Sequence, residues 1–137
     1  MRLTGSALPC NGQPLANSDM YAADQTLTAG QNLTTPGDAI KTNGADTVLL
    51  YPKATGANAS SSTTALVTFY ISQSYDGVTF TGPGIPIYMT LNGNTARIGD
   101  PWQFDTRNVM ALKVLSIVNG DASYGLSAVN VHALSLQ

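Results

Sequence analysis

An alternating stretch at residues 65–72 constrains the fold more than any other feature of this sequence. One set of side chains is apolar throughout and the set between them is mixed: Ala65, Val67, Phe69 and Ile71 alternate with Leu66, Thr68, Tyr70 and Ser72. A period of two places successive side chains on opposite faces of a β-strand. Asp76-Gly77 follows, where glycine tolerates the positive φ of a tight turn. The stretch therefore predicts a hairpin whose second strand is 78–81.

Similar signals recur along the chain. Further short strands are expected at 25–29, 39–42, 47–53, 85–91, 95–98, 109–118 and 124–134. Asn92-Gly93 and Asn119-Gly120 predict two more hairpin turns, each pairing the strand before the turn with the strand after it. Within the last strand the apolar residues change from one face to the other, which predicts a β-bulge near Ala128.

The composition of the chain agrees with a fold made of strands. Charged residues make up 10% of the 137 residues, and the sequence contains no Glu. Exposed helices usually carry Glu, Lys and Arg on their outer face, whereas Ser- and Thr-rich faces with Asn and Gly turns suit strands. We therefore predict an all-β protein with one antiparallel β-sandwich domain over residues 25–137, of jelly-roll type, with a small closed barrel as the alternative.

Residues 1–24 are predicted to form an extended N-terminal arm. Prolines, glycines and asparagines interrupt any periodicity there. The apolar residues of this segment are scattered: Leu3, Leu8, Leu15, Met20 and Tyr21. One interpretation is a floppy terminus, and the other is an arm whose apolar side chains anchor it on a neighbouring subunit.

Charge and cysteine content argue against several classes of protein. The formal net charge is −2 and the 6 Lys and Arg residues form no basic run, which gives nucleic-acid binding little electrostatic support. Cys10 is the only cysteine, so no disulfide can form within the chain. No stretch approaches the roughly 18 apolar residues of a membrane span, and the N-terminus lacks the apolar core of a signal peptide. We expect a protein made in the cytoplasm, with no membrane partner.

Few side chains in the sequence could carry catalysis. His132 is the only histidine and falls inside the last expected strand, where a surface or hydrogen-bonded residue is the expected role. Asp100 and Asp105 flank Trp102 and Phe104 and form the best candidate carboxylate pair, of the kind that cleaves glycosides. Both also suit turns, in which aspartate bonds its own backbone. We expect no metal, no cofactor and no enzymatic activity.

The aromatic residues offer an alternative, a sugar-binding platform. Trp102, Tyr75, Tyr88 and Phe80 could stack against pyranose rings, while polar neighbours would fix the orientation of the sugar. Trp102 also suits a core or interface position in a sandwich. A carbohydrate-binding module is therefore the second functional hypothesis.

Residues 71–80 resemble a hairpin found in two groups of small β-sandwich proteins. The motif Ser-x-Asp-Gly-x-x-aromatic is present as Ser74-Tyr75-Asp76-Gly77-Val78-Thr79-Phe80. Discoidin-like surface- or carbohydrate-binding modules carry such a hairpin, as do virion proteins of tailed bacteriophages. The segments 111–118 and 124–131 look like the paired strands that close these sandwiches. The Gly-, Asn-, Ser- and Thr-rich composition, the arm and the single Cys look more like a phage head decoration or cement protein.

The leading hypothesis is therefore a viral structural protein, located in the virion, that attaches to a capsid or tail protein. The run 109–118 carries apolar residues on both faces, and the second face, with Leu115 and Ile117, should meet a partner. These two residues and the apolar residues of the arm would form the interface. A surface with few charges also favours a homo-oligomer, because it solubilises a monomer weakly.

Overall fold

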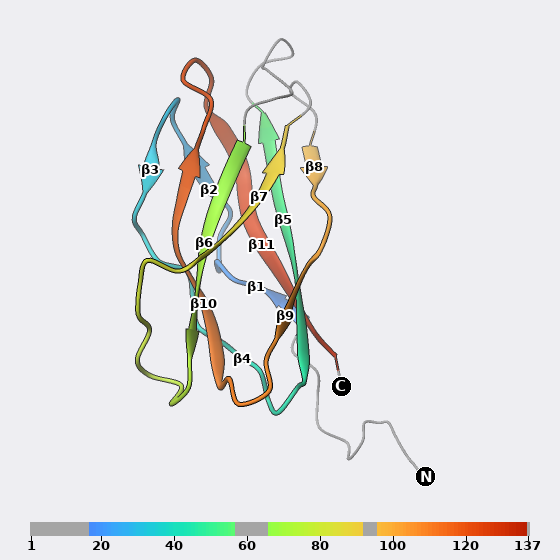
Figure 1. Ribbon diagram of the computed structural model, residues 1–137. Coiled ribbons are helices and arrows are strands. Elements are labelled where there is room, and N and C mark those ends of the chain that lie inside the picture. Colours follow the sequence, from blue (N-terminus) through green and yellow to red (C-terminus); the bar gives the residue numbers. More distant parts are fainter. Residues whose placement is uncertain (1–16, 57–65, 92–95, 137) are drawn as a thin grey trace.

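The structure is a computed structural model that describes residues 17–56, 66–91 and 96–136 (Figure 1). Within these ranges the regular secondary structure consists of strands alone, and every strand pair is antiparallel. Two sheets pack face to face with the core between them, so the predicted all-β sandwich is confirmed. The described part of the chain contains no helix with the length and apolarity needed to cross a bilayer.

Each sheet is built around two long central strands. The 6-stranded first sheet has the order β1-β11-β5-β8, with β2 also on β11 and β9 also on β5. Its strands are β1 (Asn17–Asp19), β2 (Gln25–Leu27), β5 (Thr47–Gly56), β8 (Ala96–Ile98), β9 (Trp102–Asp105) and β11 (Leu126–Leu136). The 5-stranded second sheet has the order β3-β10-β6-β7, with β4 also on β10. Its strands are β3 (Asn32–Leu33), β4 (Ile40–Lys41), β6 (Leu66–Ser74), β7 (Ile85–Thr90) and β10 (Ala111–Asn119).

Most sheet edges consist of two short strands in place of one long strand. β1 and β2 follow one another along β11, β3 and β4 along β10, and β8 and β9 along β5. Between β8 and β9, the Gly99 N–H still donates to Pro52 O over 2.7 Å. The remaining edge strand, β7, carries Pro86, which has no N–H. Short or proline-bearing edges resist pairing with other sheets, so the sheet faces are the larger surfaces open to contact.

The core lies between the two sheets and comes mainly from their central strands. The period-two alternation of β6 is visible in the burial of its side chains, because Val67, Phe69 and Ile71 are all 0% exposed. Other central-strand residues are buried with them: Val48, Leu50, Leu112, Val114, Ile117, Val129, Val131 and Ala133. Burial on one side of each strand is what a period of two predicts.

The hairpin predicted at Asp76-Gly77 is wrong. β6 pairs with β7, and residues 78–81 form a loop instead of a strand. The Asp76 Oδ1 atom accepts hydrogen bonds from the backbone N–H groups of Val78 and Thr79, over 2.8 and 2.7 Å. These local bonds fold the backbone around the aspartate side chain and take the place of the ladder that a second strand would need.

The two other predicted hairpins are also wrong, because each reversal of the chain leads from one sheet to the other. β7 belongs to the second sheet and β8 to the first, and likewise β10 to the second and β11 to the first. Residues 92–95 lie outside the described residues. At the later reversal, Gly120 N–H donates to Leu66 O over 2.9 Å, and a Cβ on Gly120 would lie 2.6 Å from that oxygen. Glycine is required here by the close approach to β6.

Two β-bulges determine which residues of the long strands face the core. The predicted bulge is confirmed, because the pairing of β11 shifts at Ala128, whose φ is 52°. A second bulge was not predicted, and it shifts the pairing of β10 with β6 between Val114 and Ser116. The extra residue turns Ile117 inward, where its side chain is 0% exposed. The predicted contact of Ile117 with a partner is therefore corrected to a core position.

The sandwich begins earlier in the sequence than predicted. β1 pairs with β11, and the next residues, Met20 and Tyr21, are 0% and 3% exposed. The Tyr21 hydroxyl donates to Thr35 O over 2.8 Å, and burial raises the pKa of Tyr21 to about 12. Residues 17–24 thus belong to the folded domain, and Met20 and Tyr21 are core residues instead of arm anchors. The other predicted anchors, Leu3, Leu8 and Leu15, lie outside the described residues.

Candidate functional site

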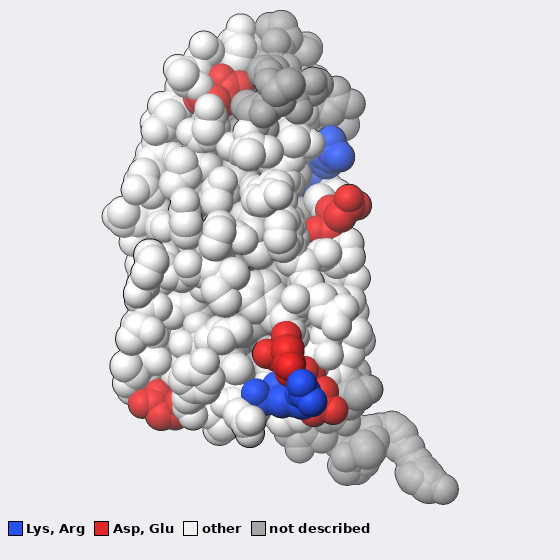
Figure 2. Space-filling model, in the orientation of Figure 1, with Lys and Arg blue, Asp and Glu red and all other residues white. Residues whose placement is uncertain are grey.

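The outer surface of the second sheet has a centre without charge. Seven outward side chains of β6, β7 and β10 form what we call the uncharged face: Leu66, Thr68, Tyr70, Tyr88, Thr90, Ser116 and Val118. The charged outward residue of β10, Lys113, lies beside this face, next to the Phe80 ring. Figure 2 shows the charged atoms toward the rim of the visible surface, around this face. Leu66 is 40% exposed and Tyr88 48% exposed. Large side chains therefore remain open to solvent on a face that carries no charge.

A loop, residues 75–84, covers the neighbouring part of the same sheet. The Ser72 Oγ donates to Thr81 O over 2.7 Å, and the Phe80 ring lies 5.0 Å from Lys113 Nζ, within cation–π range. Leu115 is half-buried there, and a Cβ on Gly82 would lie 3.6 Å from its Cδ1 atom. The sequence predicts that Leu115 meets a partner, whereas in the structure the protein's own loop covers part of it.

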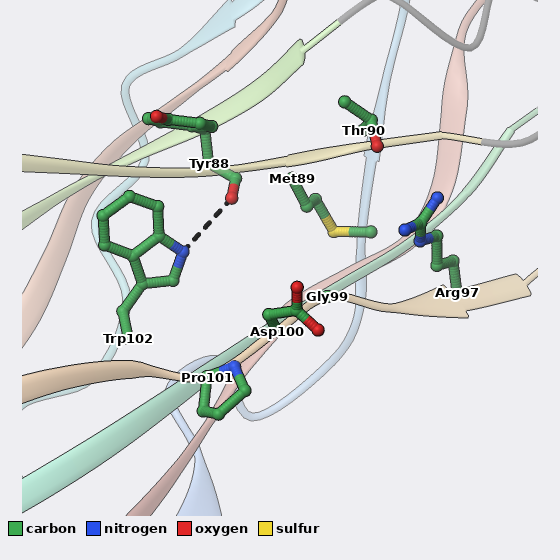
Figure 3. A pocket seen from close by; sticks show the side chains of 8 residues that line it. All are labelled: Tyr88, Met89, Thr90, Arg97, Gly99, Asp100, Pro101 and Trp102. Atoms are coloured by element: carbon green, nitrogen blue, oxygen red, sulfur yellow. Dashed lines mark hydrogen bonds between the residues drawn. The ribbon is translucent and has the colours of Figure 1, made fainter.

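A pocket of about 410 Å³ lies on the side of the sandwich, where β7 approaches residues 97–102 (Figure 3). We call it the side pocket, and its lining residues are Tyr88, Met89, Thr90, Arg97, Gly99, Asp100, Pro101 and Trp102. The Trp102 Nε1–H donates to Tyr88 O over 3.2 Å, and the two rings meet edge to face with centroids 4.9 Å apart. The structure thus brings together two aromatic residues of the predicted sugar platform.

The two other residues of that platform, Tyr75 and Phe80, lie elsewhere, in the loop of residues 75–84, where Phe80 lies beside Lys113. Tyr75 is 71% exposed and lines a different pocket with Gln73 and Ile85. In its place, the side pocket contains Met89 and Arg97, which the sequence analysis missed. Neither residue belongs to a recognisable motif, and only their position across from Trp102 in the folded chain reveals them.

The predicted carboxylate pair is divided between two sites. Asp100 lines the side pocket, whereas Asp105 lines a separate pocket with Arg107. The Arg107 Nε and Nη2 atoms donate to Asp105 over 3.0 and 2.7 Å. These hydrogen bonds, led by those from the Arg107 side chain, lower the pKa of Asp105 to about 2. Asp105, the last residue of β9, is therefore ionised and holds no proton to donate near neutral pH.

His132 belongs to a polar cluster on the outer face of the first sheet. Its Nδ1 atom lies 2.9 Å from Asp19 Oδ1, and its Nε2 atom contacts Asn17 Oδ1. The Lys53 Nζ atom lies 3.5 Å from Asp19 Oδ2. The hydrogen bond with His132 is the main cause that lowers the pKa of Asp19, with Lys53 adding to it and burial opposing it. The cluster joins β1 to β11 and β5, which fits the hydrogen-bonded strand role expected of this histidine.

The replacement Asp19→Asn is expected to destabilise the protein in a pH-dependent way. The pKa of Asp19 is lower in the folded than in the unfolded state, where an aspartate titrates near about 3.9. Its carboxylate therefore stabilises the fold above that pH, and this contribution disappears as the pH falls through the folded pKa. Because the side chain is 38% exposed, we expect a loss of only about 1 kcal/mol at pH 7.

Urea unfolding of the unmodified protein and of Asp19→Asn, at pH 7 and at pH 3, measures this loss of stability. The loss should shrink at pH 3. Asp38→Asn is the matched control, because Asp38 is exposed and has no ion pair with any described residue. Equal losses for the two variants at pH 7, or a loss for Asp19→Asn that grows on acidification, would contradict the role of this carboxylate.

No group of three or more His, Cys, Asp and Glu residues within 17–56, 66–91 and 96–136 could hold a metal ion. Cys10 lies outside these ranges. No protein-family model matches the chain, and no curated protein matches its sequence. Two features of the fold therefore bear on function, the uncharged face and the side pocket.

Proposed function

We propose that this is a non-enzymatic structural protein that attaches to a capsid or tail protein of a virion through its uncharged face. The observation that carries the proposal is the presence of exposed Leu66 and Tyr88 among outward side chains that carry no charge, while Lys113 of β10 lies beside them against the Phe80 ring. The buried centres of protein interfaces are likewise depleted in charged residues and enriched in tyrosine. A partner that covers this face would remove apolar surface from water without desolvating an ion pair.

The strand order supports a jelly-roll form of the sandwich. When two short strands that share one edge are counted as one, the described residues contain eight strand positions, and the first lies beside the last. The second lies beside the seventh, the third beside the sixth and the fourth beside the fifth. This is the order of one long hairpin that has been rolled into two sheets. Jelly rolls occur in viral capsid and lectin domains, which is an analogy of fold and not evidence of function.

Many copies on a lattice would make even a weak contact effective. Each copy that binds one face to a regular surface benefits from the high local concentration of sites, and contacts between neighbouring copies add avidity. In this proposal the segment that precedes Asn17, with Leu3, Leu8 and Leu15, reaches a neighbouring copy. The protein is then a homo-oligomer in its assembled state.

A charge placed in the uncharged face tests the proposal. Thr68 lies at the centre, opposite Tyr88 on β7 and Val118 on β10. The replacement Thr68→Lys should weaken binding at least about tenfold, because the interface would bury an unpaired charge. Binding is measured by co-sedimentation with particles assembled from the capsid or tail protein encoded in the same genome.

Thr55→Lys is the matched control, because Thr55 is also half-buried and faces outward on the opposite sheet. It should bind as the unmodified protein does. Failure of the unmodified protein to bind either kind of particle, or equal binding by both variants, would contradict the proposal.

A truncation that begins at Asn17 tests the contribution of the preceding segment. It retains β1, Met20 and Tyr21 and therefore the described core. Weaker co-sedimentation of the truncated protein is the expected result. Binding at the unmodified affinity would show that the uncharged face acts alone.

A further inference from the structure

We infer that the side pocket binds a neutral saccharide, a pyranose unit held by its hydroxyl groups and by one apolar ring face. This site adjoins the attachment surface proposed above and shares Tyr88 and Thr90 with it. The inference rests on the shape of the pocket, the fixed orientation of its aromatic end and the two opposite charges at its polar end (Figure 3).

The shape of the pocket is set by a close approach of backbone at Gly99. A Cβ on this residue would lie 2.9 Å from Met89 Cβ and 3.1 Å from Pro52 Cγ. The Gly99 N–H also donates to Pro52 O over 2.7 Å. Residues 99–101 are therefore held against β5 and β7, and the pocket is part of the folded frame. Its volume of about 410 Å³ is within the range of roughly 300–1,000 Å³ that small-ligand sites occupy.

The aromatic end has a fixed orientation. Trp102 is partly buried against the core, and its Nε1–H is held by the carbonyl oxygen of Tyr88. Pro101 lies beside it and is exposed. Indole, phenol and proline rings offer rigid apolar surface on which the C–H groups of a sugar ring can pack.

The polar end carries two charged groups that point toward the same space. Figure 3 shows the Asp100 carboxylate and the Arg97 guanidinium on either side of the Met89 thioether. Neither side chain forms an ion pair or a hydrogen bond with any other residue that the structure describes. A carboxylate accepts from two hydroxyl groups at once, and a guanidinium donates to hydroxyl or ring oxygens.

The pairing of charges selects a neutral ligand. A phosphate or carboxylate near Arg97 would be repelled by Asp100, and a cation near Asp100 would be repelled by Arg97. A wholly apolar ligand would desolvate both charges without replacing their hydrogen bonds with water. A polyhydroxylated ring satisfies both charges and also has an apolar face for the rings of Trp102 and Pro101.

The test is binding of the full-length protein to an array of immobilised neutral and acidic glycans. We expect binding to neutral pyranose glycans in preference to sialylated or sulfated ones. The replacement Asp100→Asn keeps the shape of the side chain but removes its charge and one acceptor oxygen, and should reduce binding at least tenfold. Arg97→Gln should act in the same direction. Asp105→Asn is the matched control, because Asp105 lies outside the pocket, and it should bind as the unmodified protein does.

Three results would overturn the inference: no neutral glycan bound, a preference for acidic glycans, or equal binding by Asp100→Asn and Asp105→Asn. Thr68→Lys separates the two sites. It should weaken attachment to particles at least about tenfold and leave glycan binding unchanged, because Thr68 does not line the pocket. Failure of one proposal is therefore distinguishable from failure of the other. Circular dichroism and urea unfolding of each variant verify that the fold is intact.

Discussion

Replacing Met20 with alanine is expected to lower the free energy of unfolding by about 2–5 kcal/mol, the usual cost of truncating a buried methionine. The side chain is 0% exposed and belongs to the core cluster. Its backbone is fixed as well, because Met20 N–H donates to Val131 O and Met20 O accepts from Asp38 N–H, each over 2.7 Å. The surroundings cannot collapse easily, so the cavity should persist.

Urea unfolding measures this loss. The slope of the unfolding free energy against urea concentration should stay unchanged, as expected when the transition remains two-state. Met110→Ala is the matched control, because Met110 is 55% exposed and its truncation should change stability by about 0.5 kcal/mol or less. Similar small losses of unfolding free energy in both variants would indicate that residues 17–24 belong to the predicted arm and not to the core.

Asn130→Ala is expected to cost about 2–4 kcal/mol, because several buried backbone groups would lose their partners. Asn130 is 1% exposed. Its Oδ1 atom accepts from the N–H groups of Tyr21 and Val131 over 3.0 and 2.8 Å. Its Nδ2 atom donates to Tyr21 O over 3.0 Å and to Asp24 Oδ1 over 2.8 Å. In the gap between β1 and β2, the Asn130 side chain thus replaces the backbone hydrogen bonds by which these two strands pair with β11.

Thermal and urea unfolding of Asn130→Ala would be compared with those of Asn32→Ala. Asn32 is an exposed asparagine on the short edge strand β3, and its replacement should have little effect. If the two variants lose equal stability, the side chain of Asn130 is not what holds residues 20–24 to β11.

The sandwich could be predicted because period-two alternation survives folding in the central strands. The bulge at Ala128 could be predicted as well, because the apolar set of β11 visibly changes face there. The bulge in β10 could not be predicted, because Leu115 and Ile117 are both apolar and the sequence pattern fits burial of either one. Only the pairing with β6 decides which of them is buried.

The Asp76-Gly77 and Asn119-Gly120 motifs lie at or just after the ends of β6 and β10, but the strand pairings predicted from them are wrong. Asn92-Gly93 lies outside the described residues. Asp-Gly and Asn-Gly dipeptides report local backbone freedom, whereas the partner of a strand depends on which sheet buries its apolar face. Gly120 is an example. Glycine is required at this position because the backbone oxygen of Leu66, on another strand, leaves no room for a Cβ atom. Met20 and Tyr21 were misplaced for a related reason. Their segment has no period, and its burial depends on Asn130, more than 100 residues away.

The candidate sites were predictable only in part. Tyr88 and Trp102 were named from the sequence as aromatic residues, but nothing in the sequence indicates that they touch. Arg97 and Asp100 meet them because β7 and residues 97–102 belong to different sheets whose edges come together. Such a site is a property of the tertiary structure and has no local motif.

Hydroxyl-radical footprinting of the protein free and bound to particles tests the attachment surface most directly. Tyr70 and Tyr88 lie on the uncharged face, whereas Tyr51 faces outward on the opposite sheet. Mass spectrometry should show that Tyr70 and Tyr88 become protected on binding while Tyr51 reacts as before. Protection of Tyr51 with unchanged reactivity of Tyr70 and Tyr88 would contradict attachment through the uncharged face.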